Sequence, residues 1–177
     1  MLLFLDTEFT DFIHPELISL GIVTEDGKNE YYVECNEFQH PSDFVREAVI
    51  PLLYQEGMSK NKIQDNLYTW LEKLSGNDYQ FIVDYQTDWD LLVDIMDNFP
   101  KNIDPSVLNF NQQLQTKIVL SSMKSGKLDI STKDIMSEYN NEVEDYYFKN
   151  KLPHHHALFD ARAMQRGWVK IMEYLNG

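Results

Sequence analysis

Two acidic side chains, Asp6 and Glu8, end an apolar segment that begins at Leu2. If this segment is a β-strand, side-chain alternation places both carboxylates on the same face. Adjacent carboxylates repel each other, so ionising both is unfavourable unless a cation lies between them. Carboxylate oxygens are ligands of hard divalent ions such as Mg²⁺ and Mn²⁺. The pair therefore predicts a metal site, and the alternative is a strand that ends in solvent.

A second group of acids, Asp84, Asp88 and Asp90, lies where a strand is expected to pass into a helix. Thr87 followed by Asp90 resembles a capping box, which would give Asp90 a structural role. Asp88 instead falls on the helical face that carries the apolar side chains, where a carboxylate needs a partner. The alternative for Asp88 is a first-turn acid stabilised by the helix dipole. Of the three acids, Asp88 is the metal-ligand candidate.

The third group consists of three consecutive histidines, His154, His155 and His156, followed by Asp160. Asp160 lies at the edge of the apolar stripe of the final predicted helix, so its carboxylate should point toward the interior. Residues five positions apart on a continuous helix diverge by about 140°. A histidine that shares a site with Asp160 must therefore lie on a loop before the helix.

The histidine run has two plainer explanations, an exposed loop or a purification tag. A tag is disfavoured because the run is internal and a predicted helix follows it. Zinc is disfavoured because neighbouring residues do not easily converge on one ion, and Cys35 is the only thiol. The lone cysteine also excludes an intramolecular disulfide and fits a reducing compartment.

These groups must be positioned by a sheet and its flanking helices. Apolar and alternating patterns predict strands at residues 2–8, 17–23, 30–34, 80–84 and 107–111. An Asp-Gly turn at residues 25–28 predicts a hairpin between the second and third strands. The first strand is apolar on both faces, which is typical of the centre of a sheet.

Helices are predicted where apolar residues recur at helical spacing, at residues 42–53, 59–74, 87–99, 112–122, 131–148 and 156–175. Three early strands followed by alternating strands and helices predict an α/β protein with a central mixed β-sheet flanked by helices. No linker or repeat divides the chain, so residues 1–177 are expected to form a single domain.

The net charge of −14, from 29 acids against 15 bases, argues against a protein that coats nucleic acid or an anionic membrane. The acids concentrate in residues 129–145, whereas residues 146–170 contain five bases and only one acid, Asp160. We therefore expect a local basic patch beside the third group. No apolar run approaches the ~20 residues of a membrane helix, and residues 1–5 do not resemble a signal peptide, so a soluble cytoplasmic protein is expected.

The segments FLDTEF, VDYQTDWDLL and HHHALFDARA, taken in this order, resemble the three motifs of the DEDDh 3′-to-5′ exonucleases, which have a ribonuclease H-like fold. The resemblance spans residues 2 to about 170. It implies four metal-binding acids, which fall on Asp6, Glu8, Asp88 and Asp160. It also implies a general base on His155, because only His155 satisfies the His-x-x-x-x-Asp spacing.

The resemblance implies a two-metal hydrolysis that uses two Mg²⁺ or Mn²⁺ ions and releases nucleoside 5′-monophosphates from a 3′ end. Two departures, Phe9 where many members have Thr followed by Gly, and Asp84 in place of Asn, resemble the compact bacterial and phage (mycobacterial-type) exoribonucleases. The expected partner is therefore single-stranded or short nucleic acid, with RNA favoured. The resemblance also favours a homodimer.

Aromatic residues near these motifs are candidates for stacking on bases. Phe9 is the predicted substrate contact, Tyr85 and Trp89 are weaker candidates, and core packing is the favoured alternative for Phe12. Three other functions remain open from the sequence: a DNA exonuclease with the same site, a nucleic-acid-binding module with an inactive site, and a plain interaction domain.

Overall fold

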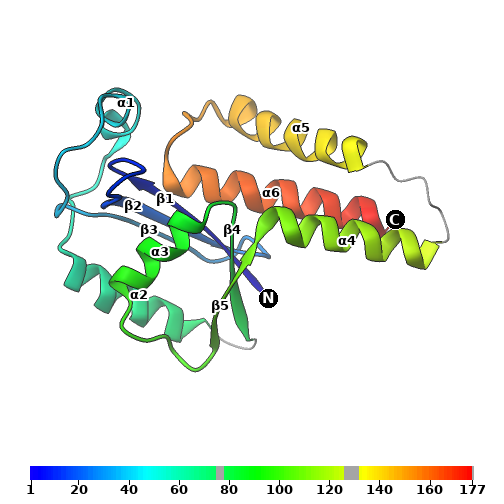
Figure 1. The fold of residues 1–177 in the computed structure, drawn as a ribbon, viewed down its shortest axis with the longest axis horizontal. Coiled ribbons are helices and arrows are strands. Elements are labelled where there is room, and N and C mark those ends of the chain that lie inside the picture. Colours follow the sequence, from blue (N-terminus) through cyan, green and yellow to red (C-terminus); the bar gives the residue numbers. More distant parts are fainter. Residues whose placement is uncertain (75–77, 126–131, 177) are drawn as a thin grey trace.

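The computed structural model describes residues 1–74, 78–125 and 132–176. Five strands form one mixed sheet in the order β3-β2-β1-β4-β5 (Figure 1). Strands β1 and β2 pair antiparallel, as do β2 and β3, whereas β4 and β5 are parallel to β1. The strands are β1 (Leu2–Phe9), β2 (Leu17–Thr24), β3 (Glu30–Glu34), β4 (Tyr79–Val83) and β5 (Ile103–Asn109). The predicted α/β class, the mixed sheet and the central place of the first strand are confirmed.

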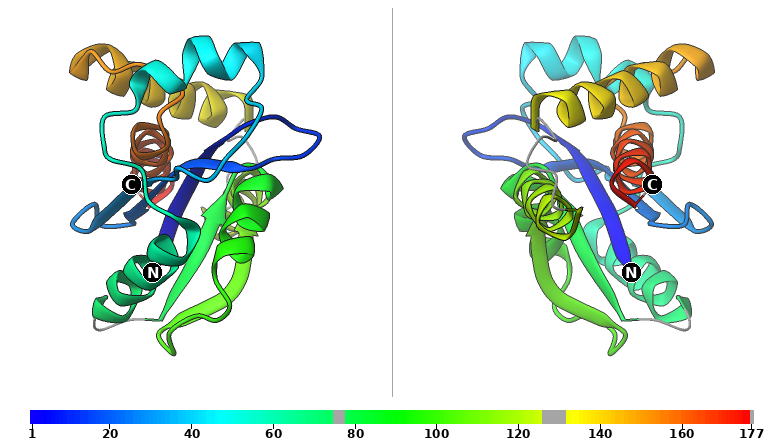
Figure 2. Two further views of the ribbon diagram at one scale, coloured as in Figure 1. Left: turned by 90° about the vertical axis from the view of Figure 1, so that its left-hand side faces the viewer. Right: turned by 90° about the vertical axis from the view of Figure 1, so that its right-hand side faces the viewer.

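Helices cover both faces of this sheet. Their bounds are α1 (Asp43–Ala48), the short 3₁₀ helix η1 (Ile50–Leu52), α2 (Lys60–Lys73), α3 (Gln86–Ile95), α4 (Phe110–Ser125), α5 (Thr132–Asn150) and α6 (Ala157–Asn176). Helices α2 and α3 pack on one face, and α4 and α6 on the other (Figure 2). Helix α5 lies along α6 and extends beyond the sheet (Figure 1).

The alternation of side chains along β1 explains this layering. Leu3 and Leu5 are fully buried in the core cluster shared with α2 and α3. Phe4 points to the opposite face and packs among side chains of α4 and α6. A strand buried on both faces has apolar residues at every position, which is the pattern that residues 2–5 show.

Several predicted boundaries differ from the structure, and prolines explain some of these differences. The helix predicted at 42–53 ends at Ala48 and is followed by the 3₁₀ helix η1, which contains Pro51. Strand β5 begins at Ile103 rather than 107, and its pairing with β4 shifts register around Pro105, which a strand at the sheet edge tolerates. Helix α3 ends at Ile95 rather than 99, because Pro100 disfavours helical geometry in the residues before it. Helix α4 begins two residues earlier than expected, at Phe110.

The predicted capping box at Thr87 and Asp90 is wrong. Helix α3 begins at Gln86, and its N-cap residue Tyr85 makes no side-chain capping bond. Thr87 therefore lies inside the first turn, and the exposed Asp90 carboxylate accepts a hydrogen bond from Gln86 Nε2 at 2.9 Å. The face of α3 that carries Asp88 is buried, as the apolar pattern predicted.

Two sequence predictions fall partly outside the described residues: the start of the helix predicted at 131 and the start of the acidic stretch at 129. Cys35 is a free, buried thiol. In the part of the chain that the structure describes, no helix is both long and apolar enough to cross a membrane.

Candidate metal centre

The site begins where β1 and β4 part. Their parallel ladder ends at the pair Phe4–Ile82. Asp6 and Asp84 each lie two residues beyond this pair, so they occupy equivalent positions on neighbouring parallel strands, Asp6 within β1 and Asp84 directly after β4. The two acids are 78 positions apart in the sequence, and the register of the sheet brings them together.

Asp88 reaches the same place from the first turn of α3. The backbone N–H and the hydroxyl of Thr7 both donate to Asp88 Oδ1, at 3.1 and 2.6 Å. The residue is 2% exposed, and its second oxygen, Oδ2, is buried without a hydrogen-bond partner among the described residues. One oxygen of Asp88 is thus fixed by β1, while the other is free for a ligand.

These three acids form a compact group. Asp6, Asp84 and Asp88 each offer one carboxylate oxygen, and the three oxygens lie within 4.8 Å of one another. Such a set of oxygen donors suits a hard divalent cation.

The start of α6 brings the second half of the site against the sheet, and Gly21 on β2 makes this approach possible. Gly21 pairs with Asp6 across the β1–β2 ladder. A Cβ at this position would lie 2.5 Å from the backbone nitrogen of Leu158, so only glycine lets α6 come this close. The first turn of α6 then carries Asp160 to the edge of the acidic group.

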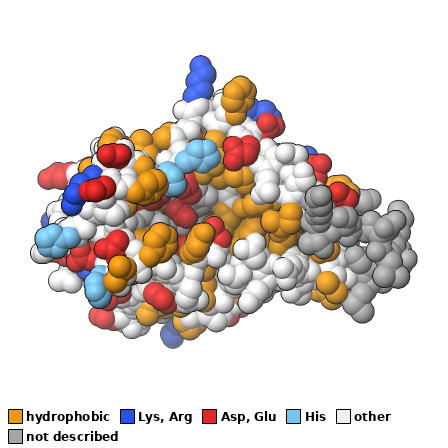
Figure 3. All heavy atoms as spheres, turned by 45° about the horizontal axis from the view of Figure 1, so that its top comes forward, with side chains coloured by type: hydrophobic (Ala, Val, Ile, Leu, Met, Phe, Trp, Pro, Cys, Tyr) orange, Lys and Arg blue, Asp and Glu red, His pale blue; other side chains and the backbone are white. Residues whose placement is uncertain are grey.

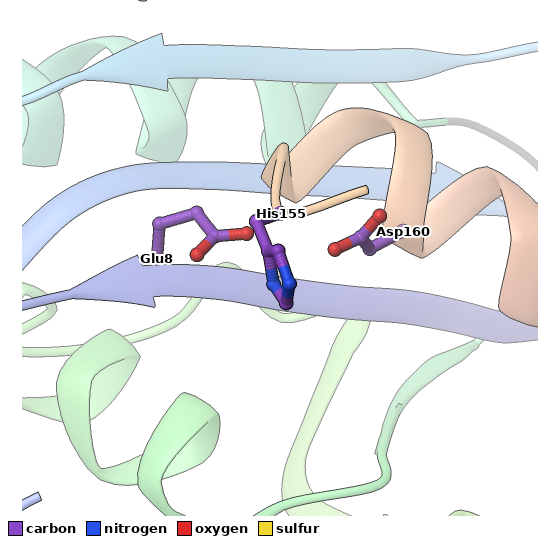
Figure 4. A group of neighbouring side chains, drawn as sticks. All are labelled: Glu8, His155 and Asp160. Atoms are coloured by element: carbon purple, nitrogen blue, oxygen red, sulfur yellow. The ribbon is translucent and has the colours of Figure 1, made fainter. Parts of the chain in front are cut away.

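His155, on the loop before α6, has a left-handed backbone conformation with φ of 64°. This geometry is strained for a residue with a side chain, and such strain is typical of functional positions. The ligand atoms of Glu8, His155 and Asp160 lie within 4.8 Å of one another (Figure 4). The imidazole is therefore already beside both carboxylates.

The other two histidines have different surroundings. The His154 ring lies against Tyr147, with 4.0 Å between ring centroids. His156 is 3% exposed and is stacked between Tyr32 and Phe159. The three neighbouring rings therefore do not converge on one point, which removes the basis for a zinc site built from the histidine run.

Helix α5 adds Tyr147, whose hydroxyl donates a short hydrogen bond to Asp160 Oδ1. Burial, together with the nearby carboxylate of Asp160, raises the pKa of Tyr147, so the phenol keeps its proton and remains a donor. This bond fixes one oxygen of Asp160.

The carboxylates raise one another's pKa values. Burial, with the charge of Asp160 and Asp88, raises the pKa of Glu8 to about 8. Burial and four neighbouring acids, Asp88 first, hold the pKa of Asp6 well above its usual range. Burial likewise raises the pKa values of Asp84 and Asp160, and raises that of Asp88 despite the bonds from Thr7. A divalent cation would reverse this balance and favour the ionised forms.

These groups line a cavity of about 650 Å³ whose walls are largely apolar. The space-filling view shows acidic side chains in a hollow that hydrophobic side chains and histidines surround (Figure 3). Among the described residues that line this cavity, none is Lys or Arg. The predicted basic patch is therefore wrong for the cavity itself. Arg162 instead pairs with Glu30 at 2.5 Å, and Lys149 with Asp145 at 2.6 Å.

The aromatic residues predicted as candidates for base stacking differ in whether they line the cavity. Phe9 lines the cavity and packs edge-on against Phe12, with 5.0 Å between ring centroids. Phe12 is 78% exposed at the rim, so core packing is wrong for this residue. Tyr85 also lines the cavity and is exposed. Trp89 is half-buried, stacks on Phe99 against the core and does not line the cavity, so its suggested role as a base-stacking residue is wrong.

The structure thus brings together all five predicted site residues, with Phe9 beside them: Asp6, Glu8, Asp88, His155 and Asp160. Sequence reasoning did not assign Asp84, Thr7 or Tyr147 to the site. Asp84 had a detectable signal, since it ends an apolar predicted strand much as Asp6 and Glu8 end the first one. Tyr147 lies in an acidic helix with no pattern that marks it.

Fold and cavity together define an α/β protein in which five carboxylates and one imidazole form two groups of possible metal ligands in a single cavity. No model of a known protein family matches the chain, and no curated protein matches it either. The arrangement of the side chains is therefore the basis for the function proposed next.

Proposed function

We propose that this chain is a metal-dependent 3′-to-5′ exoribonuclease of the DEDDh type with a ribonuclease H-like fold, acting on single-stranded or short RNA. The observation that carries the proposal is the convergence of four acids from β1, α3 and α6, together with His155, on one cavity. The three sequence motifs that resemble this family lie far apart in the chain and meet at this place. If the protein were a plain interaction domain and the motifs coincidental, their residues would not be expected to converge on one cavity.

The residues present fit divalent cations. The donors are mainly carboxylate oxygens. Asp88 Oδ2 is buried and has no partner in the described part of the chain, which is costly unless a cation or another group pairs with it. Asp6, Glu8, Asp88 and Asp160 would hold Mg²⁺ or Mn²⁺. When bound, such ions supply an activated water and neutralise charge on the phosphodiester.

His155 is positioned to accept the proton of the attacking water. Its ring lies beside the carboxylates of Glu8 and Asp160, with ligand atoms of all three residues within 4.8 Å of one another (Figure 4). The ring is exposed to the cavity, so a water can reach it. Phe44 packs edge-on against the imidazole at 5.0 Å between centroids and limits its movement.

Three features support a short strand end as the substrate. Apart from the acids and histidines, the lining is largely apolar, and none of its described residues is a cation that could track a long phosphate backbone. Phe9 and the exposed Phe12 offer aromatic faces and edges on which any base can stack. The net charge of −14 disfavours binding to long duplexes.

The test is an assay of 5′-labelled RNA and DNA oligonucleotides of the same sequence with Mn²⁺, analysed for nucleoside 5′-monophosphates. We expect stepwise shortening of RNA from the 3′ end, loss of activity with a chelator, and at least a hundredfold loss in Asp6→Asn. Asp90→Asn is the matched control, because Asp90 is an exposed acid of α3 outside the cavity. Preferential cleavage of DNA would contradict the RNA assignment. Binding of RNA without cleavage would indicate an inactive nucleic-acid-binding module.

A further inference from the structure

Asp84 lines the cavity and lies in one of its two groups of possible metal ligands, but the four-acid pattern does not include it. The register of β1 and β4 places it level with Asp6, and its carboxylate oxygen lies within 4.8 Å of those of Asp6 and Asp88. No other strand end in the described sheet carries acids that meet in this way. The position of Asp84 is set by the rigid part of the site, since it follows directly on β4.

No described group donates a hydrogen bond to the buried carboxylate oxygen of Asp84. Asn109 Nδ2 donates to the backbone carbonyl of Asp84, at 3.4 Å, and not to the carboxylate. Asp84 Oδ1 is buried without a hydrogen-bond partner among the described residues, as is Asp88 Oδ2. Asp88 is itself 2% exposed, so an unpartnered, almost fully buried carboxylate points into the same group.

We propose that Asp84 is a fifth carboxylate ligand, and that Asp6, Asp84 and Asp88 form an all-carboxylate site that binds a divalent cation before any substrate arrives. The proposal rests on the proposed function for the presence of a metal, and extends it to a residue that the resemblance leaves unassigned. Two unpartnered oxygens and a third carboxylate within 4.8 Å supply oxygen donors without help from a phosphate.

The proposal makes the two halves of the site chemically unequal. The group of Asp6, Asp84 and Asp88 contains only oxygen donors, whereas the group of Glu8, His155 and Asp160 includes an imidazole nitrogen. Hard cations prefer the first kind of site. We therefore expect one cation to bind tightly to the free protein, and Asp84 to contribute to that event.

The experiment measures Mn²⁺ binding to the substrate-free protein by isothermal calorimetry and by the electron paramagnetic resonance signal of free Mn²⁺. Asp84→Asn keeps the shape of the side chain and removes its charge, and we expect its tightest site to be weakened at least tenfold. Asp84→Glu keeps the charge and should retain more affinity than Asp84→Asn. Asp90 is an acid of α3 outside the cavity, so Asp90→Asn should bind Mn²⁺ as the wild type does.

The outcomes separate this proposal from the proposed function. If Asp84→Asn is folded and binds Mn²⁺ as the wild type does, Asp84 is not a ligand, and the exonuclease assignment is unaffected. The same holds if only the KM for RNA changes, since Asp84 would then contact substrate. If the wild type binds Mn²⁺ through Asp84 but cleaves neither RNA nor DNA, the ligand assignment stands and the enzyme assignment fails. If Asp84→Asn does not fold, Asp84→Glu is compared with Asp6→Asn instead. A folded Asp84→Glu that binds Mn²⁺ as weakly as Asp6→Asn would show that the retained charge does not restore binding, and this would overturn the proposal.

Discussion

Replacing Glu8 with Gln should stabilise the metal-free protein at pH 8, although it removes a residue that the proposed function requires. Glu8 is largely buried and lies beside Asp160 and Asp88; burial first, and then the charges of these two acids, raise its pKa from 4.5 to about 8. Ionising this side chain in the folded protein therefore opposes folding. Gln has nearly the same shape and no charge to repel the neighbouring carboxylates.

The size of the effect follows from the pKa shift. A change from 4.5 to about 8 corresponds to about 5 kcal/mol, at about 1.4 kcal/mol per pKa unit. Solvent that reaches this partly exposed carboxylate screens the repulsion and reduces the gain to about 2 kcal/mol. For a chain of this length, that gain raises the melting temperature by about 4–8 °C.

The pH dependence has a definite sign. Because the folded-state pKa of Glu8 is raised, the folded protein binds this proton more tightly than the unfolded chain does. The stability of the wild type therefore falls as the pH rises from 4.5 to about 8. Gln does not titrate, so Glu8→Gln should differ little from the wild type near pH 4.5 and most at pH 8.

Thermal melts of wild type, Glu8→Gln and Glu72→Gln at pH 5 and pH 8, all with chelator, test this reasoning. Glu72 is an exposed residue of α2 outside the cavity, so its variant should melt like the wild type at both pH values. Adding Mn²⁺ at pH 8 should reverse the order, because the wild type gains a ligand that Glu8→Gln lacks. A Glu8→Gln protein that melts at or below the wild-type temperature at pH 8 would refute the repulsion argument.

Three further predictions concern the assembly of the site. Mn²⁺ should raise the wild-type melting temperature more at pH 8 than at pH 5, since the ligands must lose protons to bind it. An equal rise at the two pH values in the same melts would contradict a carboxylate site. Gly21→Ala should destabilise the protein by about 1–3 kcal/mol and weaken Mn²⁺ binding, because its methyl group would push α6 away from β2. An unchanged free energy of unfolding in denaturant, with an unchanged Mn²⁺ affinity by calorimetry, would contradict this. Tyr147→Phe should lower kcat for RNA at least tenfold with little change in KM, because Asp160 loses the donor that orients it; an unchanged kcat in steady-state kinetics would make the bond dispensable.

The parts of the site that depend on local pattern could be predicted from the sequence. The continuous apolar run before Asp6 indicates a central strand, and alternation then places Glu8 on the same face as Asp6. The buried face of α3 identifies Asp88, because a carboxylate among apolar side chains stands out. In each case the spacing within one element carries the information.

The parts that depend on contacts between elements could not be predicted. The place of Asp84 follows from where the β1–β4 ladder ends, and that register is not written in either strand alone. Tyr147 joins the site because α5 packs along α6, and its own helix gives no sign of this role. None of the bases in residues 146–170 lines the cavity, and this also depends on contacts between elements: Arg162, for example, pairs with Glu30 on a strand more than a hundred residues earlier.

The two halves of the site reach the end of β1 from opposite faces of the sheet. Helix α3, on one face, supplies Asp88 and is tied to β1 through Thr7. Helix α6, on the other face, supplies Asp160 and rests on the sheet beside Gly21. Without a cation, the carboxylates of the two halves repel each other: after burial and Asp88, the charges of Asp160 and Glu8 also raise the pKa of Asp6. Cation binding would therefore join the two helical layers as well as prepare the site, so the docking of α6 and the affinity for metal should rise and fall together.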